Sequence, residues 1–123
     1  MSDSQAGSGN PENMGAESVI VSIDAQGNVS VSKDPVRVKQ PKQKILWKLD
    51  SSSVRKWKLE GIEWCGDPPP EGEFHDWRHD EKEASVIDRN STRGEWRYGI
   101  RYRAKGKPGE TKLFDPIIRN EPQ

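Results

Sequence analysis

Three side chains that commonly bind transition metals occur close together in the sequence: Cys65, His75 and His79. A thiolate and two imidazoles are ligands of zinc and blue-copper sites. His75 and His79 would place both rings on one side only if their segment were helical, and no Cys-x-x-Cys pair supports a site. The competing interpretation is a small buried thiol and two exposed loop histidines. We therefore predict no cofactor and no metal, with Cys65, His75 and His79 kept as the metal-binding alternative.

The sequence gives little support for a catalytic site. Cys65 and His75 are a formal nucleophile and base, but the neighbourhood of Cys65 is acidic, which disfavours the thiolate. Neighbouring carboxylates such as Glu71 and Glu73 lie in a polar stretch that is typical of solvated surface. The glycines occur singly, without the fingerprint of a phosphate or dinucleotide loop. We predict that the protein is not an enzyme.

The stretch EWRYGIRYRA (95–104) mixes aromatic and basic residues, as surfaces that bind nucleic acid do. Its alternation separates them on a strand: Trp96, Tyr98 and Tyr102 share one face, and Arg97, Arg101 and Arg103 share the other. Stacked bases and paired phosphates require rings and cations on the same face. We therefore expect the rings in the core and the cations in solvent, which favours an acidic protein partner over nucleic acid.

Two surfaces are candidates for binding. If strands 44–49 and 95–104 share a sheet, Lys44 and Lys48 join Arg97, Arg101 and Arg103 in one basic face, which suits an acidic protein or another polyanion. The acidic loop 66–83 is the second candidate, because Phe74 and Trp77 either plug an end of the fold or offer a pair of anchors to a partner. The main hypothesis is a non-enzymatic interaction module. Binding of a polyanion or nucleic-acid backbone is the alternative.

The elements that must position these residues show a period of two and no convincing helix. The predicted strands cover residues 18–23, 28–32, 34–39, 44–49, 54–64, 85–90, 95–104 and 111–120, with turn signals about every ten residues. The last of them is expected to break at Asp115-Pro116. Residues 66–83 are interpreted as a polar loop, and Gly61 as the mark of a bulge. The pattern predicts an all-β protein: an antiparallel two-sheet sandwich of seven or eight strands. Residues 1–16 lack large apolar side chains other than methionine and are expected to be a disordered tail before the domain at 17–121.

Composition limits the remaining possibilities. Of 123 residues 30% are hydrophobic and 33% charged, so the core must be thin and must depend on the five tryptophans. The net charge is zero but uneven, because 36–60 holds eight Lys or Arg against two acids and 61–90 holds three against nine. A single cysteine allows no disulfide within the chain, and no apolar run is long enough to cross a membrane. We expect a cytoplasmic protein without a membrane partner.

The order of motifs also resembles a known type of protein. A first hairpin is followed by WKL, GIEW, an aromatic EFHDW, a DRN turn, the alternating WRYGIRY and a terminal DPIIRN. This resembles small bacterial single-domain proteins of unestablished function with an immunoglobulin-like or cupredoxin-like sandwich. The resemblance covers about residues 17–121 and implies a fold but no activity. In cupredoxins the copper-binding Cys, second His and Met lie near the carboxyl terminus; here Cys65 precedes both histidines and no Met follows Met14, so the resemblance implies a version without copper.

Overall fold

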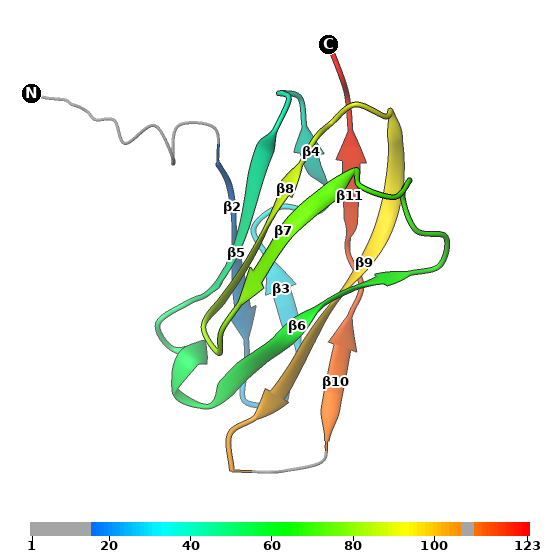
Figure 1. The fold of residues 1–123 in the computed structure, drawn as a ribbon. Coiled ribbons are helices and arrows are strands. Elements are labelled where there is room, and N and C mark those ends of the chain that lie inside the picture. Colours follow the sequence, from blue (N-terminus) through cyan, green and yellow to red (C-terminus); the bar gives the residue numbers. More distant parts are fainter. Residues whose placement is uncertain (1–15, 107–109) are drawn as a thin grey trace, which may run out of the picture.

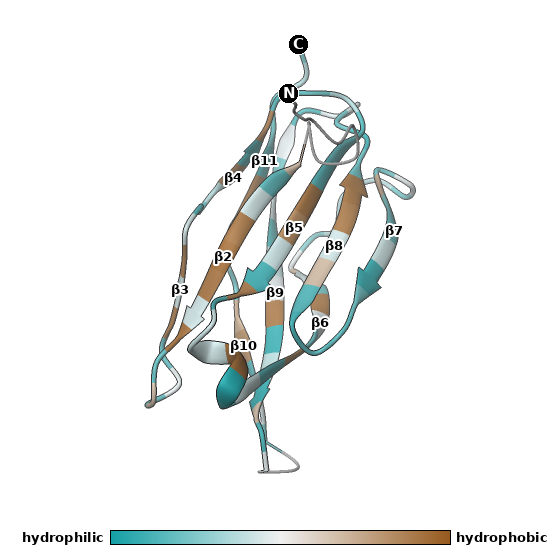
Figure 2. Cartoon of the chain, turned by 90° about the vertical axis from the view of Figure 1, so that its left-hand side faces the viewer, coloured by the Kyte–Doolittle hydropathy of each residue, from teal (hydrophilic) through white to brown (hydrophobic). Residues whose placement is uncertain are grey.

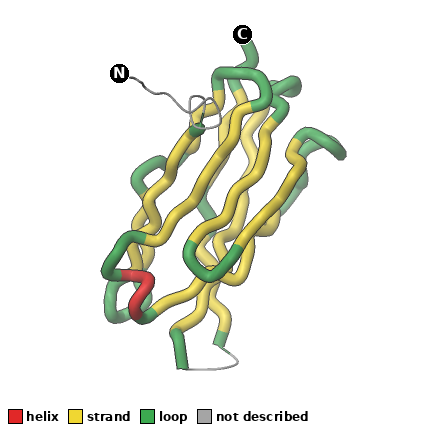
Figure 3. Tube along the Cα trace, turned by 60° about the vertical axis from the view of Figure 1, so that its left-hand side comes forward, coloured by secondary structure: helices red, strands yellow, loops and turns green. Residues whose placement is uncertain are grey.

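Ten β-strands build almost all of the regular structure in a computed structural model that describes residues 16–106 and 110–123 (Figures 1 and 3). The one helical element there is a single 3-10 turn, η1 (Ser53–Arg55). The strands are β2 (Glu17–Ile23), β3 (Val29–Val31), β4 (Val36–Val38), β5 (Gln43–Leu49), β6 (Trp57–Cys65), β7 (Phe74–His79), β8 (Glu83–Asp88), β9 (Gly94–Ala104), β10 (Thr111–Phe114) and β11 (Ile117–Asn120).

The strands form two sheets that lie face to face (Figure 1). Sheet I has the order β3-β2-β5-β8-β7. Sheet II is centred on the long β9, which pairs with β6 along one edge and with β10 and β11 in turn along the other, and β4 adds to β11. β10 takes the carboxyl-terminal half of β9 and β11 the amino-terminal half, because the chain breaks at Asp115-Pro116, where proline cannot donate to a ladder.

The predicted all-β sandwich is confirmed, with two differences in detail. Two strand pairs are parallel, β2 with β5 and β11 with β4, so both sheets are mixed. The described residues also contain a strand that was not predicted, at 74–79, whereas the break expected in 111–120 at Asp115-Pro116 is present between β10 and β11. Alternation of side chains is the same in parallel and antiparallel strands, so it could not indicate the direction of pairing. Of the predicted tail, residues 1–15 lie outside the described residues.

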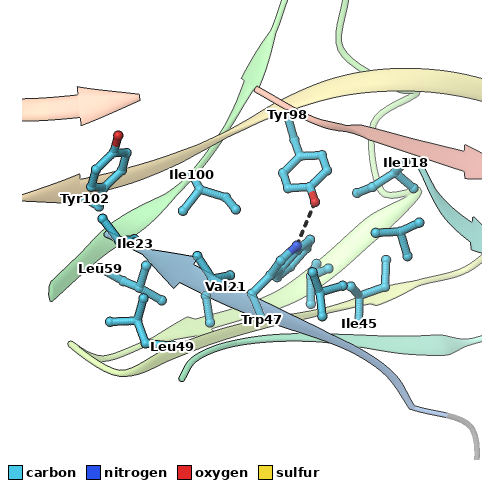
Figure 4. Close-up of a cluster of buried hydrophobic side chains, with 14 of the residues drawn as sticks. Val21, Ile23, Ile45, Trp47, Leu49, Leu59, Tyr98, Ile100, Tyr102 and Ile118 are labelled. Carbon is cyan, nitrogen blue, oxygen red and sulfur yellow. Dashed lines mark hydrogen bonds between the residues drawn. The ribbon is translucent and has the colours of Figure 1, made fainter. Parts of the chain in front are cut away.

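The core lies between the sheets and is built by one face of each strand. Figure 2 shows the resulting alternation of hydrophobic and hydrophilic residues along β2, β5 and β8. At its centre the Trp47 indole of sheet I meets the Tyr98 ring of sheet II at 5.1 Å between centroids. Trp47 Nε1–H donates a 2.9 Å hydrogen bond to Tyr98 Oη (Figure 4). A buried indole N–H needs such a partner, so this bond lets both rings be fully enclosed.

A second polar contact between the core and the backbone involves Tyr102. Tyr102 packs edge-on against Trp57 at 5.6 Å and donates its hydroxyl to the carbonyl oxygen of Gly27 at 2.8 Å. The prediction that Tyr98, Ile100 and Tyr102 face the core is confirmed, since all three are buried. These aromatic rings pack among a larger number of buried aliphatic side chains from both sheets.

Asp50, directly after β5, is expected to make the stability of the fold depend on pH. Its carboxylate accepts hydrogen bonds from the Ser22 hydroxyl at 2.6 Å and the Ser53 backbone N–H at 2.8 Å. These bonds, the one from Ser22 first, lower the pKa of Asp50 from 3.8 to about 2. A depressed folded-state pKa means that the stabilisation is present above the unfolded pKa and is lost as pH falls through the folded one.

We therefore expect Asp50→Asn to be less stable than the wild type at neutral pH, and the difference to shrink as pH falls from about 5 to 2.5. Urea unfolding followed by tryptophan fluorescence at several pH values measures it. A difference that stays constant over this range would contradict the assignment to the Asp50 carboxylate.

Candidate functional site

The five cations of the predicted basic face lie on two different sheets. Lys44 and Lys48 belong to β5 in sheet I, whereas Arg97, Arg101 and Arg103 belong to β9 in sheet II. The expectation that these two strands share a sheet is wrong. Side chains that point away from the core of a sandwich leave its two sheets in opposite directions. The five residues therefore form no single surface, although each of them is at least partly exposed, as expected.

The β9 arginines are matched by carboxylates on neighbouring elements. Arg97 meets Asp115 at 2.5 Å, Arg101 meets Glu63 at 2.9 Å, and Arg103 meets Glu60 at 2.8 Å. Glu60 and Glu63 lie on β6, which pairs with β9. These two ion pairs could not be predicted, because the sequence does not indicate which strands are neighbours. Exposed pairs of this kind stabilise a fold little, about 0–1 kcal/mol each. Their effect here is to neutralise the outer surface of sheet II.

The three candidate metal ligands, Cys65, His75 and His79, do not form a cluster in the structure. Cys65 lies on β6 in sheet II, and its Sγ would be 3.0 Å from a Cβ placed on Gly99 of β9. His75 and His79 lie on β7 in sheet I, where His75 Nδ1 contacts Asp76 at 3.2 Å. Within the described part of the chain, no three His, Cys, Asp or Glu residues are grouped so as to hold a metal ion. Burial, then the charges of Asp115 and Glu63, raise the pKa of the Cys65 thiol, which disfavours a nucleophilic thiolate.

The segment predicted as a loop contains the edge strand of sheet I. β7 pairs antiparallel with β8 through a tight turn, in which Asp80 Oδ1 accepts the backbone N–H groups of Lys82 and Glu83 at 2.8 and 3.0 Å. The polar composition that suggested a loop is also typical of an exposed edge strand. The prediction of a loop is therefore wrong for residues 74–79.

An irregularity in β7 brings its two aromatic residues to the same side. The register with β8 shifts between His75 and Arg78, and Asp76 has φ 58°. Phe74 and Trp77 are three positions apart, so regular alternation would send them to opposite faces. The shift instead lets both contact Trp64 of β6, with ring centroids at 4.8 Å for Phe74 and 5.7 Å for Trp77. Phe74 is buried in this cluster, whereas Trp77 is 41% exposed.

A pocket of about 370 Å³ opens beside this cluster, between the edge strands of the two sheets. We call it the β6–β7 groove; residues that line it include Ile62, Trp64, Trp77, Arg78, His79 and Arg101. β6 pairs with β9 alone and β7 with β8 alone among the described strands, so each turns one open edge toward the groove. Next to the lining residues Glu60 and His79, the Leu59 N–H donates a 2.9 Å hydrogen bond to the Glu81 carbonyl oxygen and so links β6 to the β7–β8 turn.

Sequence reasoning identifies Trp77 but misses the residues that complete its surroundings. Alternation assigns Trp64 to the core, and it does pack there, but it also lines the groove. Nothing in the sequence distinguishes Arg78 from the other exposed cations. The register shift that makes these residues neighbours lies between His75 and Arg78, where Asp76 has positive φ. Aspartate tolerates this conformation better than most residues, but it occurs too often elsewhere to signal a bulge. Only the excess of aromatic residues in GIEW and EFHDW points to this region.

Comparison with known proteins gives no family: no protein-family model matches the chain, and no curated protein matches it in sequence. Among the described residues, no helix has the length and apolar character needed to span a membrane. The groove and the surrounding charges therefore have to be interpreted from their own geometry.

Proposed function

We propose that the protein is a non-enzymatic binding module that takes up an extended, acidic segment of a partner protein in the β6–β7 groove. The observation that carries the proposal is the exposure of Trp77, 41%, in the lining of a pocket that Trp64 and Ile62 also line. Tryptophan is the residue type most enriched at the energetic centres of protein interfaces. A large apolar side chain of the partner would fill the pocket against these rings.

The open strand edges support an extended partner. β6 and β7 each leave one row of backbone N–H and C=O groups without a strand partner among the described residues. Peptides that bind by strand addition use such rows for affinity and use pockets for alternate side chains. The bond between Leu59 and Glu81 already uses one backbone N–H of β6, so the segment would pair nearer to Trp64 and Trp77.

The charge around the groove supports an acidic segment. Both acids that line the groove are paired: Glu63 with Arg101, and Glu60 with Arg103, which lies outside the lining. Within the described residues Arg78 makes no ion pair and is exposed, so it is the available cation of the groove. A carboxylate on the partner would meet the Arg78 guanidinium in a bidentate pair.

Selection from a displayed library of random peptides tests this function and does not require the partner to be identified first. We expect enriched peptides to combine a large apolar residue with acids. Trp77→Ala should weaken their binding about 30-fold, as loss of a hot spot of about 2 kcal/mol does. Fluorescence anisotropy with labelled peptides measures the change. Ile20→Ala is the matched control, because Ile20 is 40% exposed on another strand, β2, and should leave binding unchanged.

A second pair of variants separates the role of charge. Arg78→Ala should weaken acidic peptides, whereas Arg97→Ala should not, because Arg97 already pairs with Asp115 on sheet II. Equal binding by Trp77→Ala and wild type, or a library that yields no binder, would exclude the groove as the binding surface.

Three further proposals rest on the sequence pattern alone. The immunoglobulin-like or cupredoxin-like type of the sandwich and a bacterial origin rest on the order of motifs from WKL to DPIIRN. A cytoplasmic setting rests on the single cysteine. Polyanion binding through the β9 arginines is less favoured than binding in the groove, since each of these arginines faces a carboxylate within 2.9 Å.

A further inference from the structure

Four polar side chains meet inside the fold and connect its two sheets. They are Glu73 just before β7, Asp88 at the end of β8, Asn90 two residues later, and Asn120 at the end of β11; we call them the Asp88 cluster. Their exposure ranges from 0% for Asp88 to 4% for Asn90, and none of them lines the β6–β7 groove. Asp88 belongs to sheet I and Asn120 to sheet II, so the bonds of the cluster cross from one sheet to the other.

Hydrogen-bond donors compensate the buried charge of Glu73. Glu73 Oε2 accepts the backbone N–H groups of Ser91 and Thr92, both at 2.8 Å, and Oε1 accepts the Ser91 hydroxyl at 2.5 Å. Burial raises the pKa of Glu73, but these hydrogen bonds outweigh it and hold the pKa below its usual value. Glu73 is therefore a buried anion in the folded protein.

Asp88 has donors on only one of its two carboxyl oxygens. Oδ1 accepts the backbone N–H of Asn90 at 2.9 Å and Asn120 Nδ2 at 3.1 Å, and the same Nδ2 also donates to Glu73 Oε2 at 3.1 Å. Oδ2 is buried too, and no donor reaches it from the described residues. Asn90 Oδ1 and Asn120 Oδ1 are also buried without a donor, so the cluster lacks hydrogens rather than acceptors. An anion at Asp88 would leave a charged oxygen buried without a partner, which is costlier than a buried neutral group.

The elements packed around Asp88 offer it no positive charge. Its strand partners are Gln43 of β5 and Phe74 of β7, and neither is charged. Among the described residues, no Lys or Arg forms an ion pair with Asp88 or Glu73. Glu73 is the charged side chain that acts on Asp88, and its charge is also negative.

The basic side chains next to Asp88 in the sheet lie on other sides of it. Lys44 and His75 are both opposite Ile87, one position before Asp88, so alternation places them on the outer face of sheet I. Arg89, the next residue in the chain, is exposed. A proton on the carboxyl group itself is therefore the way in which the fold neutralises Asp88.

We infer that Asp88 is a pH-sensitive link between the two sheets: its carboxyl group carries a proton on Oδ2 in the intact cluster, and loss of that proton loosens the cluster. Ionisation places a second negative charge beside Glu73 in the protein interior. Water relieves this charge once the β8–β9 connection opens, and Ser91 and Thr92 are the residues of that connection that Glu73 holds.

The titration of Asp88 sets the pH range of this device. Burial above all, and to a smaller extent the charge of Glu73, raise the pKa of Asp88 from 3.8 to about 6, against the hydrogen bonds from Asn90 and Asn120. Between these pH values the folded chain keeps a proton that the unfolded chain has lost. The stability that this proton gives is fully present below about pH 3.8 and is lost as pH rises through about 6.

Thermal unfolding of the wild type and of Asp88→Asn at pH 5 and pH 7.5 tests the inference. Asparagine keeps Oδ1 and carries N–H groups at the position of Oδ2, so it imitates the protonated carboxyl group but cannot ionise. The two proteins should have similar Tm values at pH 5. At pH 7.5 the wild type should have an unfolding constant about tenfold larger than that of the variant and a Tm about 5 °C lower. A Tm difference that is the same at both pH values would overturn the inference.

The comparison is designed to isolate Asp88 from other titrating groups. Asp88→Asn retains both histidines, so a pH dependence that arises from His75 or His79 would persist in it. Asp50→Asn is the matched control, because Asp50 is a hydrogen-bonded carboxylate outside the cluster whose pKa is lowered to about 2. It should keep the wild-type dependence between pH 5 and pH 7.5. Loss of the dependence in Asp50→Asn as well would assign it to another group and contradict the inference.

The proton and the loosening are each measured directly by NMR on the wild type. Carbon NMR of the side-chain carboxyl groups should show Asp88 titrating with a midpoint at about pH 6. Hydrogen-exchange protection at the amides of Ser91 and Thr92 should fall from pH 5 to pH 7.5 in the wild type but not in Asp88→Asn. An Asp88 carboxyl group that is already ionised at pH 5, or protection that stays constant in the wild type, would overturn the inference even if the variant failed to fold.

Discussion

Trp47→Ala is expected to lower the free energy of unfolding by about 3–5 kcal/mol, a larger loss than we expect from any other single substitution in this protein's core. Trp47 is 0% exposed and lies between the two sheets, so its removal leaves a cavity that both sheets line. The same change strips the Tyr98 hydroxyl of its hydrogen bond. Small domains are stable by about 5–15 kcal/mol in total, so the variant should be partly unfolded at moderate temperature. Urea unfolding followed by circular dichroism measures the loss.

The substitution Tyr98→Phe separates the contribution of the hydrogen bond to stability from that of ring packing. It keeps the ring that contacts Trp47 at 5.1 Å and removes only the acceptor of the indole N–H. We expect a loss of about 1–3 kcal/mol, the cost of leaving one buried donor unpaired. If Trp47→Ala cost no more than Tyr98→Phe, the indole would contribute a hydrogen bond and little packing, and the description of the core would be wrong.

Glu73→Ala is expected to cost roughly 2–4 kcal/mol, through a different mechanism. The substitution removes the acceptor of the Ser91 and Thr92 backbone N–H groups and one acceptor of the Asn120 amide. The connection between β8 and β9 should loosen first. Faster hydrogen exchange at the amides of Ser91 and Thr92 would report this loosening, and chemical unfolding gives the overall loss.

Glu73→Gln is the control for shape. The glutamine keeps the volume and one acceptor oxygen, but its NH2 group faces donors where the carboxylate accepted the Ser91 hydroxyl. The stability of Glu73→Gln should lie between those of Glu73→Ala and the wild type. Equal stability of all three proteins would show that water satisfies these donors and that the carboxylate is not needed to hold the connection.

Much of the fold could be predicted from alternation alone, because alternation decides which side of a strand is buried. In β9, Tyr98, Ile100 and Tyr102 are inside and Arg97 and Arg101 outside, as predicted. The bulge expected at Gly61 is also present, between Leu59 and Gly61, where φ is 140°. Glycine marks such positions because it tolerates positive φ. The strand neighbours were not predictable, because a period of two carries no information about partner or direction.

The candidate site could be predicted only in part, for the same reason. Trp77 was identified from its type and its polar surroundings, but its contact with Trp64 depends on a register shift at Asp76 that lacks a glycine signal. The prediction of a single basic face is wrong because it required Lys48 and Arg101 to share a sheet, whereas β5 and β9 lie in different sheets. The carboxylates that neutralise Arg101 and Arg103 come from β6, and a sequence read strand by strand does not show which strand lies alongside.

The parallel pairing of β11 with β4 has a consequence for how the chain reaches this structure. β4 finds its only strand neighbour among the described residues in β11, and the Ile117 N–H bonds to Asp34 Oδ1 across 83 residues. Contacts between such distant segments require closure of a large loop, which slows folding relative to hairpins. The β7–β8 and β9–β10 hairpins should thus form early, and docking of β11 onto β4 should complete sheet II last. Until then the apolar face of β4 stays in water, and the incomplete chain is at its most prone to aggregation.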